Sequence, residues 1–309
     1  MMKKSISLFL LSSFLFSCGH SPKADKLITN EIIQAIETSK QYKQTPFYYA
    51  EIYSSHVKWE LFINGTQMFA NYRGNITVPL NYNILVSGKQ KLTICIYSSN
   101  GQDVLGDYAT FKMRLFYNEN FRDKEDPEIH ILNFELPYEQ TKDLSSFEKS
   151  FEFEAKVPYQ ITGWRNSKDL TKVPDLEKKV VKKIEALRAI LENKDSEAYF
   201  QAVMPKLKEK FIFLYATQQE IKNYFQEHSL TNGEYSKLFN DIKILPIRDY
   251  QIIIEPNNRI VKLRQKEGDL FFDGIKFKAI FKENNKESNG SYLFRFHIPE
   301  GSDEFEVIR

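Results

Sequence analysis

The chain has 309 residues, 42% of them hydrophobic and 14% aromatic, which is enough apolar material for packed cores and excludes a disordered chain. Its length predicts two domains, because single cores rarely grow beyond about 250 to 300 residues. Lys and Arg number 43 and Asp and Glu number 41, and two of the lysines, Lys3 and Lys4, lie in a segment that we expect to be removed. The remaining chain is then neutral, which argues against nucleic-acid binding through a strongly basic surface.

The first 17 residues have the order of a secretory signal. Lys3 and Lys4 precede an apolar run from Ile6 to Phe16, and the small Ser17 follows it. The run is about half of the roughly 20 apolar residues that a membrane-spanning helix needs, and no other stretch is apolar enough to span a membrane. We therefore expect residues 1–17 to be a cleaved signal peptide.

A cysteine stands directly after this segment. The sequence Leu15-Phe16-Ser17-Cys18 resembles the lipobox of bacterial lipoproteins. The resemblance implies cleavage before Cys18 and a diacylglycerol thioether on its sulfur. Two or more acyl chains anchor a protein stably, so we expect the mature protein to be held on a membrane of the cell envelope. Gly19 and His20 resemble the residues that direct lipoproteins to the outer membrane, and the sequence leaves open which face carries the protein.

Residues 18–45 read as a lipidated tether followed by a short helix. Apolar residues recur there at spacings of three to four, at Leu27, Ile28, Ile32, Ile33 and Ile36. Cys18 and Cys95 are the only cysteines, so a lipidated Cys18 leaves Cys95 without a disulfide partner. We expect Cys95 to be a packed small residue rather than a reactive thiol.

Residues 46–165 show a period of two, which is typical of half-buried strands. The alternation is clearest in the runs 58–63, 91–97, 110–115 and 151–155. Turn signals separate these runs, among them Asn64-Gly65, Ser87-Gly88 and Asp126-Pro127. Seven or more short strands in this length predict an all-β sandwich.

The segment from Ser87 to Ile94, followed by Ser98-Ser99-Asn100-Gly101, resembles the late strands of bacterial immunoglobulin-like modules. There, a glycine turn leads into a strand of alternating aliphatic residues and then into a polar turn. The resemblance implies an immunoglobulin-like fold and carries over no functional residue.

Residues 166–174 read as a linker, and residues 175–309 as an α+β domain in which helices precede an antiparallel sheet. Asp175 is a predicted helix cap, and Pro205 should break or kink the second helix. Thr217 with Glu220, and Thr231 with Glu234, both fit the capping-box spacing at a helix start. Strands are expected from Ile242 onward. This order of elements is similar to that of the nuclear-transport-factor-2-like superfamily, with no residue motif to support it.

Residues that often carry chemistry are scattered. No two histidines lie within two to five residues of each other, and no metal-binding spacing occurs, so we predict neither metal nor cofactor. His130 and His297 each alternate with apolar neighbours on a strand and should face solvent or a polar partner. Glu152 and Glu154 are the best carboxylate pair, although Phe151 and Phe153 make them the ordinary wet side of a strand.

Two acidic or amide-rich turns, 269–274 and 284–290, lack the spacing of a calcium loop and are predicted to be hairpin turns. Aromatic residues gather in the first domain and could form either core or an exposed stacking platform, with core favoured by strand propensity. They are Phe47, Tyr48, Tyr49, Tyr53, Trp59, Tyr72 and Tyr82.

These patterns predict a membrane-anchored, non-enzymatic binding or adaptor protein with a protein partner of unknown identity. One form of this hypothesis is an immunity lipoprotein that neutralises a periplasmic toxin. Two alternatives stay open: an envelope hydrolase with a dispersed active site in the C-terminal domain, because triads assemble from distant residues, and a glycan-binding sandwich that uses Trp59 or its tyrosine neighbours. No catalytic residue is predicted.

Overall fold

The computed structural model describes residues 37, 42–72, 74–99, 102–267 and 270–309. The predicted signal, Cys18 and the predicted short helix lie outside these residues. Among the described residues, no helix is both long and apolar enough to cross a bilayer.

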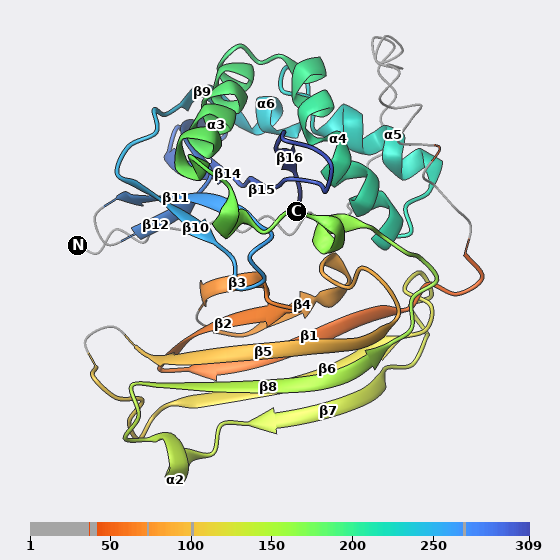
Figure 1. Ribbon diagram of the computed structural model, residues 1–309, viewed down its shortest axis with the longest axis vertical. Helices are drawn as coiled ribbons and strands as arrows, with labels where there is room; N and C mark the ends of the chain where they lie inside the picture. The colour runs from red at the N-terminus through yellow and green to blue at the C-terminus, as the bar shows by residue number, and fades with distance from the viewer. Residues whose placement is uncertain (1–36, 38–41, 73, 100–101, 268–269) are drawn as a thin grey trace.

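Eight strands form the N-terminal part of the described chain. They are β1 (Phe47–Ser55), β2 (Val57–Ile63), β3 (Thr66–Tyr72), β4 (Ile76–Pro79), β5 (Gly88–Ser98), β6 (Thr110–Asn118), β7 (Ile129–Glu135) and β8 (Ser146–Ala155). They pair antiparallel into two four-stranded sheets, in the orders β4-β1-β6-β7 and β3-β2-β5-β8. The sheets lie face to face (Figure 1), and one hydrophobic core contains residues of both.

The period of two explains why these strands form two layers. On β2, Trp59, Leu61 and Ile63 have no exposed surface, whereas the residues between them are half-buried. Because side chains of a strand alternate between its faces, each strand buries one row against the opposite sheet. Two short elements join the strands, the 3-10 turn η2 (Leu80–Tyr82) and α2 (Tyr138–Thr141).

The C-terminal part begins with helices and ends with strands, as predicted. The helices are α3 (Leu176–Glu192), α4 (Ser196–Phe213), α5 (Gln218–Glu227) and α6 (Glu234–Leu238). The strands are β9 (Phe239–Ile244), β10 (Tyr250–Ile254), β11 (Val261–Glu267), β12 (Leu270–Asp273), β13 (Ile275–Phe281), β14 (Glu287–Tyr292), β15 (Arg295–His297) and β16 (Glu306–Val307).

These strands form two sheets where the sequence predicted one. Strands β10, β11, β12, β15 and β16 make one antiparallel sheet, and β14, β13 and β9 make another. Strand β14 ends at Tyr292 and β15 begins at Arg295, so these two strands, which follow each other closely in the sequence, belong to different sheets. Apolar side chains of both sheets and of α3 to α5 share a second hydrophobic core.

Three local predictions need correction. Pro205 does not break helix α4, because Val203, Met204 and Leu207 are buried around it and hold both halves against the core. Asp175 stands at the start of α3 but makes no side-chain cap. Thr231 contacts the Ser229 hydroxyl, with the two oxygens 3.2 Å apart, and does not cap α6.

The N-terminal and C-terminal parts meet in a buried junction (Figure 1). Phe213, Tyr215 and Ile260 of the C-terminal part belong to the same hydrophobic core as the two four-stranded sheets. The Tyr215 hydroxyl donates to the Pro46 carbonyl at 2.7 Å, and the Gln67 amide donates to Glu255 at 3.0 Å. Buried polar groups are costly when unpaired, so these bonds fix the two parts in one relative orientation.

The predicted linker takes part in this junction. It contains the 3-10 turn η4 (Leu170–Lys172), and its first residue, Asn166, is the last residue of the 3-10 turn η3 (Gly163–Asn166). Leu170 is fully buried, and its backbone amide donates to the Asn258 carbonyl at 2.8 Å. The segment is therefore an ordered connection between the two parts.

Candidate functional site

Four large apolar side chains are exposed at one end of the two-sheet part. They are Val104 at 39%, Tyr108 at 75%, Tyr138 at 38% and Leu144 at 43% of their full accessibility. We call these four residues the tip patch. All four come from two segments, the connection between β5 and β6 and the connection around α2, and α2 lies at the side of this part farthest from the helices of the C-terminal part (Figure 1). Exposed apolar side chains that gather in one place mark binding surfaces more often than scattered ones do.

Hydrogen bonds hold the two segments of the tip patch together. The backbone amides of Leu105 and Gly106 donate to the carbonyls of Leu144 and Lys142, each at 2.8 Å. The Tyr138 hydroxyl donates to the Asp107 carboxylate at 2.7 Å. Leu105 is buried beneath the patch and ties it to the sheet core. The patch is thus presented on a fixed backbone.

Acidic residues surround the tip patch. Asp103, Asp107, Glu139 and Asp143 are all exposed in the same two segments. Lys142 is the one basic residue in segments 102–109 and 137–145, and its ammonium lies 3.4 Å from Glu139. The rim of the patch therefore carries a net negative charge.

The tip patch lies at the opposite end of β1 from the point where the chain enters the fold. Thr45, just before β1, forms a bridge with Asn120. His56, just after β1, has its ring 5.9 Å from that of Tyr108 in the patch. A strand of nine residues spans about 30 Å, which is the distance between entry point and patch along this strand.

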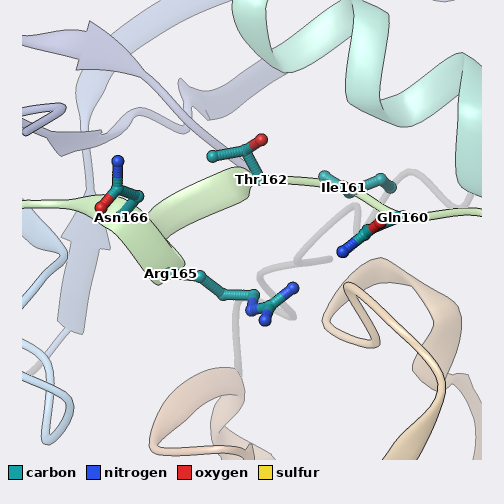
Figure 2. Close-up of a pocket in the computed structure, with 5 residues that line it drawn as sticks. All are labelled: Gln160, Ile161, Thr162, Arg165 and Asn166. Carbon is teal, nitrogen blue, oxygen red and sulfur yellow. The ribbon is translucent and has the colours of Figure 1, made fainter.

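A polar cavity lies beside the junction, on the turn η3 (Figure 2). Its volume is about 430 Å³, and it is lined by Gln160, Ile161, Thr162, Arg165 and Asn166. A second cavity of about 240 Å³ is lined in part by Arg165, Trp164, Asn64, Asn83 and Lys89. Arg165 lines both, so we treat the two cavities as one feature and call it the junction groove.

The two predicted histidines differ in their surroundings. His130 is exposed on β7. His297 is buried, and its Nδ1 lies 2.7 Å from the Ser167 hydroxyl, which is the polar partner that the alternation allowed. Burial and the nearby Arg309 lower the pKa of His297 to about 4. The structure does not bring the two histidines together.

The carboxylates and Cys95 lie on outer sheet faces. Glu152 and Glu154 are exposed, and Glu152 lies 3.6 Å from the Lys89 ammonium. Cys95 is half-buried on the outer face of β5 rather than packed in the core. Burial and the neighbouring Glu148 raise the pKa of its thiol to about 11, which keeps the thiol protonated and unreactive.

The aromatic residues of the first part are mainly core. Phe47, Tyr48 and Trp59 are buried, and Tyr53 is exposed at 48%. The burial of Trp59 removes it as an exposed stacking platform. The side chain of Tyr72 lies outside the described side chains.

Of the two segments considered for calcium, Leu270–Asp273 forms strand β12 rather than a hairpin turn, whereas Asn284 lies in the turn before β14. Asp273 accepts hydrogen bonds from Lys262 and Arg264, both at 2.7 Å. Asn284 accepts from the Lys286 amide within a turn, and Asp269 lies outside the described residues. No group of three or more His, Cys, Asp or Glu in the described part of the chain could hold a metal ion.

Sequence reasoning missed both the tip patch and Arg165. The available signal for the patch was the apolar Val104, Tyr108 and Leu144 among polar turn residues, where the period of two stops.

Comparison of the chain with protein-family models, with curated proteins and with solved structures finds no match.

Proposed function

We propose that this chain is an exported, lipid-anchored adaptor that binds a protein partner through the tip patch. The tip patch is the observation that carries the proposal, because it gathers four exposed apolar side chains on a hydrogen-bonded backbone. Aromatic side chains with restricted freedom are common anchors of protein interfaces. Binding rather than catalysis is the proposed role, since the best carboxylate pair, Glu152 and Glu154, lines neither cavity of the junction groove.

The position of the patch fits an anchored protein. A lipid on Cys18 would hold the chain at the membrane upstream of Thr45. The patch lies about 30 Å farther on, at the other end of β1, so it can face away from the anchored end. The junction supports this display, because buried bonds keep the C-terminal part from swinging across the patch.

The charge of the rim indicates the chemistry of the partner. Asp103, Asp107, Glu139 and Asp143 outnumber the one basic residue, Lys142, in the two segments. A complementary partner carries Lys or Arg around an apolar centre, and such charge pairs mainly speed association and set specificity. We therefore propose a protein with a basic rim as the partner.

We further propose that the N-terminal part is an immunoglobulin-like sandwich. The order β3-β2-β5-β8 matches the order of one immunoglobulin sheet, and the buried Trp59 on β2 takes the place of the tryptophan on the third strand of that fold. The other sheet departs from the family pattern. There, β6 lies beside β1, where immunoglobulin domains have their first strand, and β7 extends the sheet.

The adaptor proposal is tested by crosslinking in intact cells. A photo-crosslinking amino acid replaces Tyr108, and in a matched control it replaces Gln219, which is exposed on α5 of the other part. We expect one discrete protein adduct at position 108 that is absent at position 219. Adding Leu144→Ser to the first variant should reduce the adduct several-fold.

The charge argument adds a second readout. Replacing Asp103 and Asp143 by Asn should weaken the same adduct, because the complementary charges are lost. Equal adducts at positions 108 and 219, or no adduct at position 108, would contradict the docking role of the tip patch.

A further inference from the structure

Beyond the docking role, we infer that the junction groove binds an acidic sugar, with the Arg165 guanidinium holding the acid group. The site is separate from the tip patch and does not depend on it. The inference rests on the fixed backbone of the groove, on its unengaged polar side chains and on the charge of its lining.

The backbone under the groove is fixed on both sides of η3. After β8, the side chains of Val157, Tyr159 and Ile161 are buried in alternation, and the Ile161 amide donates to the Leu85 carbonyl at 2.8 Å. Gln160 and Thr162, which alternate with these buried residues, are exposed to solvent.

Gly163 anchors the turn itself. It has a φ of +50°, which favours glycine, and a Cβ on it would lie 2.8 Å from Leu85 Cδ1, so a larger residue would be strained and would require Leu85 to shift. The Gly163 amide donates to Glu209 at 2.9 Å, and the next residue, Trp164, is buried with the Arg309 guanidinium over its ring at 5.1 Å. The exposed residues that follow, Arg165 and Asn166, are thus held on a rigid support.

The polar side chains that line the larger cavity have no partner among the residues that the structure describes. Those of Gln160, Thr162, Arg165 and Asn166 make no hydrogen bond or ion pair with any residue that the structure describes, and Figure 2 shows Arg165 extending from the turn. Amide and hydroxyl groups can both donate and accept, which suits a ligand with many hydroxyl groups.

The charge of the lining favours an acidic ligand. Arg165 lines both cavities, Lys89 lines the smaller one and is paired with Glu152, and no Asp or Glu is among the described lining residues. A guanidinium binds a carboxylate or a phosphate through two parallel hydrogen bonds, which gives the Arg165 site a preference for these groups. The shared ligand chemistry is therefore an oxyanion carried on a polyhydroxylated body, such as a uronic acid or a sugar phosphate.

The size of the groove agrees with a small saccharide. Its larger cavity, about 430 Å³, lies within the roughly 300 to 1,000 Å³ that is usual for small-molecule sites. The exposed setting predicts weak binding, which saturation-transfer NMR and titration calorimetry can both measure.

The test titrates the full-length protein with three probes: trigalacturonic acid, glucose 6-phosphate and neutral maltotriose. We expect at least one of the two acidic probes to bind while maltotriose does not, and the acidic probe that binds identifies the acid group. The variant Arg165→Gln should weaken this binding at least about tenfold, because a charge-assisted pair is lost. Arg165→Lys should retain part of the binding of the acidic probe, because the positive charge is kept.

The matched control is Arg248→Gln, which removes an exposed arginine that lines neither cavity. This control should bind the acidic probe like the unchanged protein. Because Arg165 is exposed, its variants should fold normally, which thermal melting monitors. Equal binding by maltotriose, no binding by either acidic probe, or full binding by Arg165→Gln would overturn the inference.

Discussion

A buried lysine contributes to the junction. Lys262 of β11 is 1% exposed, and its ammonium donates to Gln67 of β3 at 2.5 Å and to Asp273 at 2.7 Å. A charge at this depth is tolerated only because both partners compensate for the lost hydration. Lys262 thus couples the two parts by polar contacts.

Replacing Lys262 by Met should lower the free energy of unfolding by about 3 kcal/mol, because Gln67 and Asp273 lose a buried partner. Urea denaturation measures the loss. The matched control is Lys278→Met, at an exposed lysine of β13, which should change stability by less than about 0.5 kcal/mol. Similar losses in both variants would show that the buried contacts are unimportant.

His297 makes stability depend on pH. Burial lowers the pKa of His297 to about 4, from an ordinary value of 6.5. The unfolded chain therefore binds this proton at a higher pH than the folded protein does. The contribution of neutral, buried His297 to the free energy of unfolding is complete above about pH 6.5 and is lost as the pH falls toward 4.

We therefore expect the urea midpoint to fall between pH 6.5 and pH 4, and to fall less in His297→Gln. The difference should be on the order of 1 kcal/mol per pH unit for one histidine. His130→Gln, at an exposed position, should keep the slope of the unchanged protein. An identical slope in His297→Gln would contradict the assignment.

At the scale of elements, α5 begins with a capping box, as the spacing of Thr217 and Glu220 predicted. The Thr217 hydroxyl accepts from the Glu220 amide, and Glu220 accepts from the Thr217 amide at 2.7 Å. Glu220 also accepts from Arg122 of the N-terminal part at 2.7 Å, so the cap contributes to the junction.

Replacing Thr217 by Ala should cost about 1 kcal/mol, the usual value for a lost helix cap. Thermal unfolding followed by circular dichroism measures the effect. Thr231→Ala is the matched control, because Thr231 has the same predicted spacing but no capping contact, and it should cost less than about 0.5 kcal/mol. A larger effect of Thr231→Ala than of Thr217→Ala would contradict the claim that Thr217 caps a helix and Thr231 does not.

Most of the mainly β architecture and the order of elements could be predicted, because local periodicity and turn residues encode them. Trp59 alternates with Lys58 and Glu60 on β2 in the way the pattern predicted. The path of α4 through Pro205 could not be predicted, because burial of distant side chains outweighs the local penalty. The division of the C-terminal strands into two sheets likewise depends on long-range pairing.

The candidate sites were less accessible to prediction. The tip patch joins residues from segments 102–109 and 137–145, which meet only when the two sheets pair. Arg165 is the last residue of the predicted first domain, and no pattern around it predicts a cavity. When a site is formed by segments that are distant in the sequence, its residues can be recognised only once the fold is known.

At the scale of the whole molecule, the buried junction, where side chains of the C-terminal part join the N-terminal core, predicts that the two parts unfold together. Trp59 and Trp164 report the N-terminal core and the junction by fluorescence, whereas circular dichroism reports mainly α3 to α5. We expect the two denaturation curves to coincide. Separate midpoints would show that the parts are independent and that the junction is weak.

The proposed orientation of the tip patch depends on the lipid anchor that the sequence predicts at Cys18. The most direct test is metabolic labelling with a clickable fatty-acid analogue, followed by membrane fractionation, with Cys95→Ser as the matched control. We predict a labelled, membrane-bound protein in the unchanged chain and in Cys95→Ser, and loss of both label and membrane binding in Cys18→Ser. Label that persists in Cys18→Ser would contradict the lipid anchor.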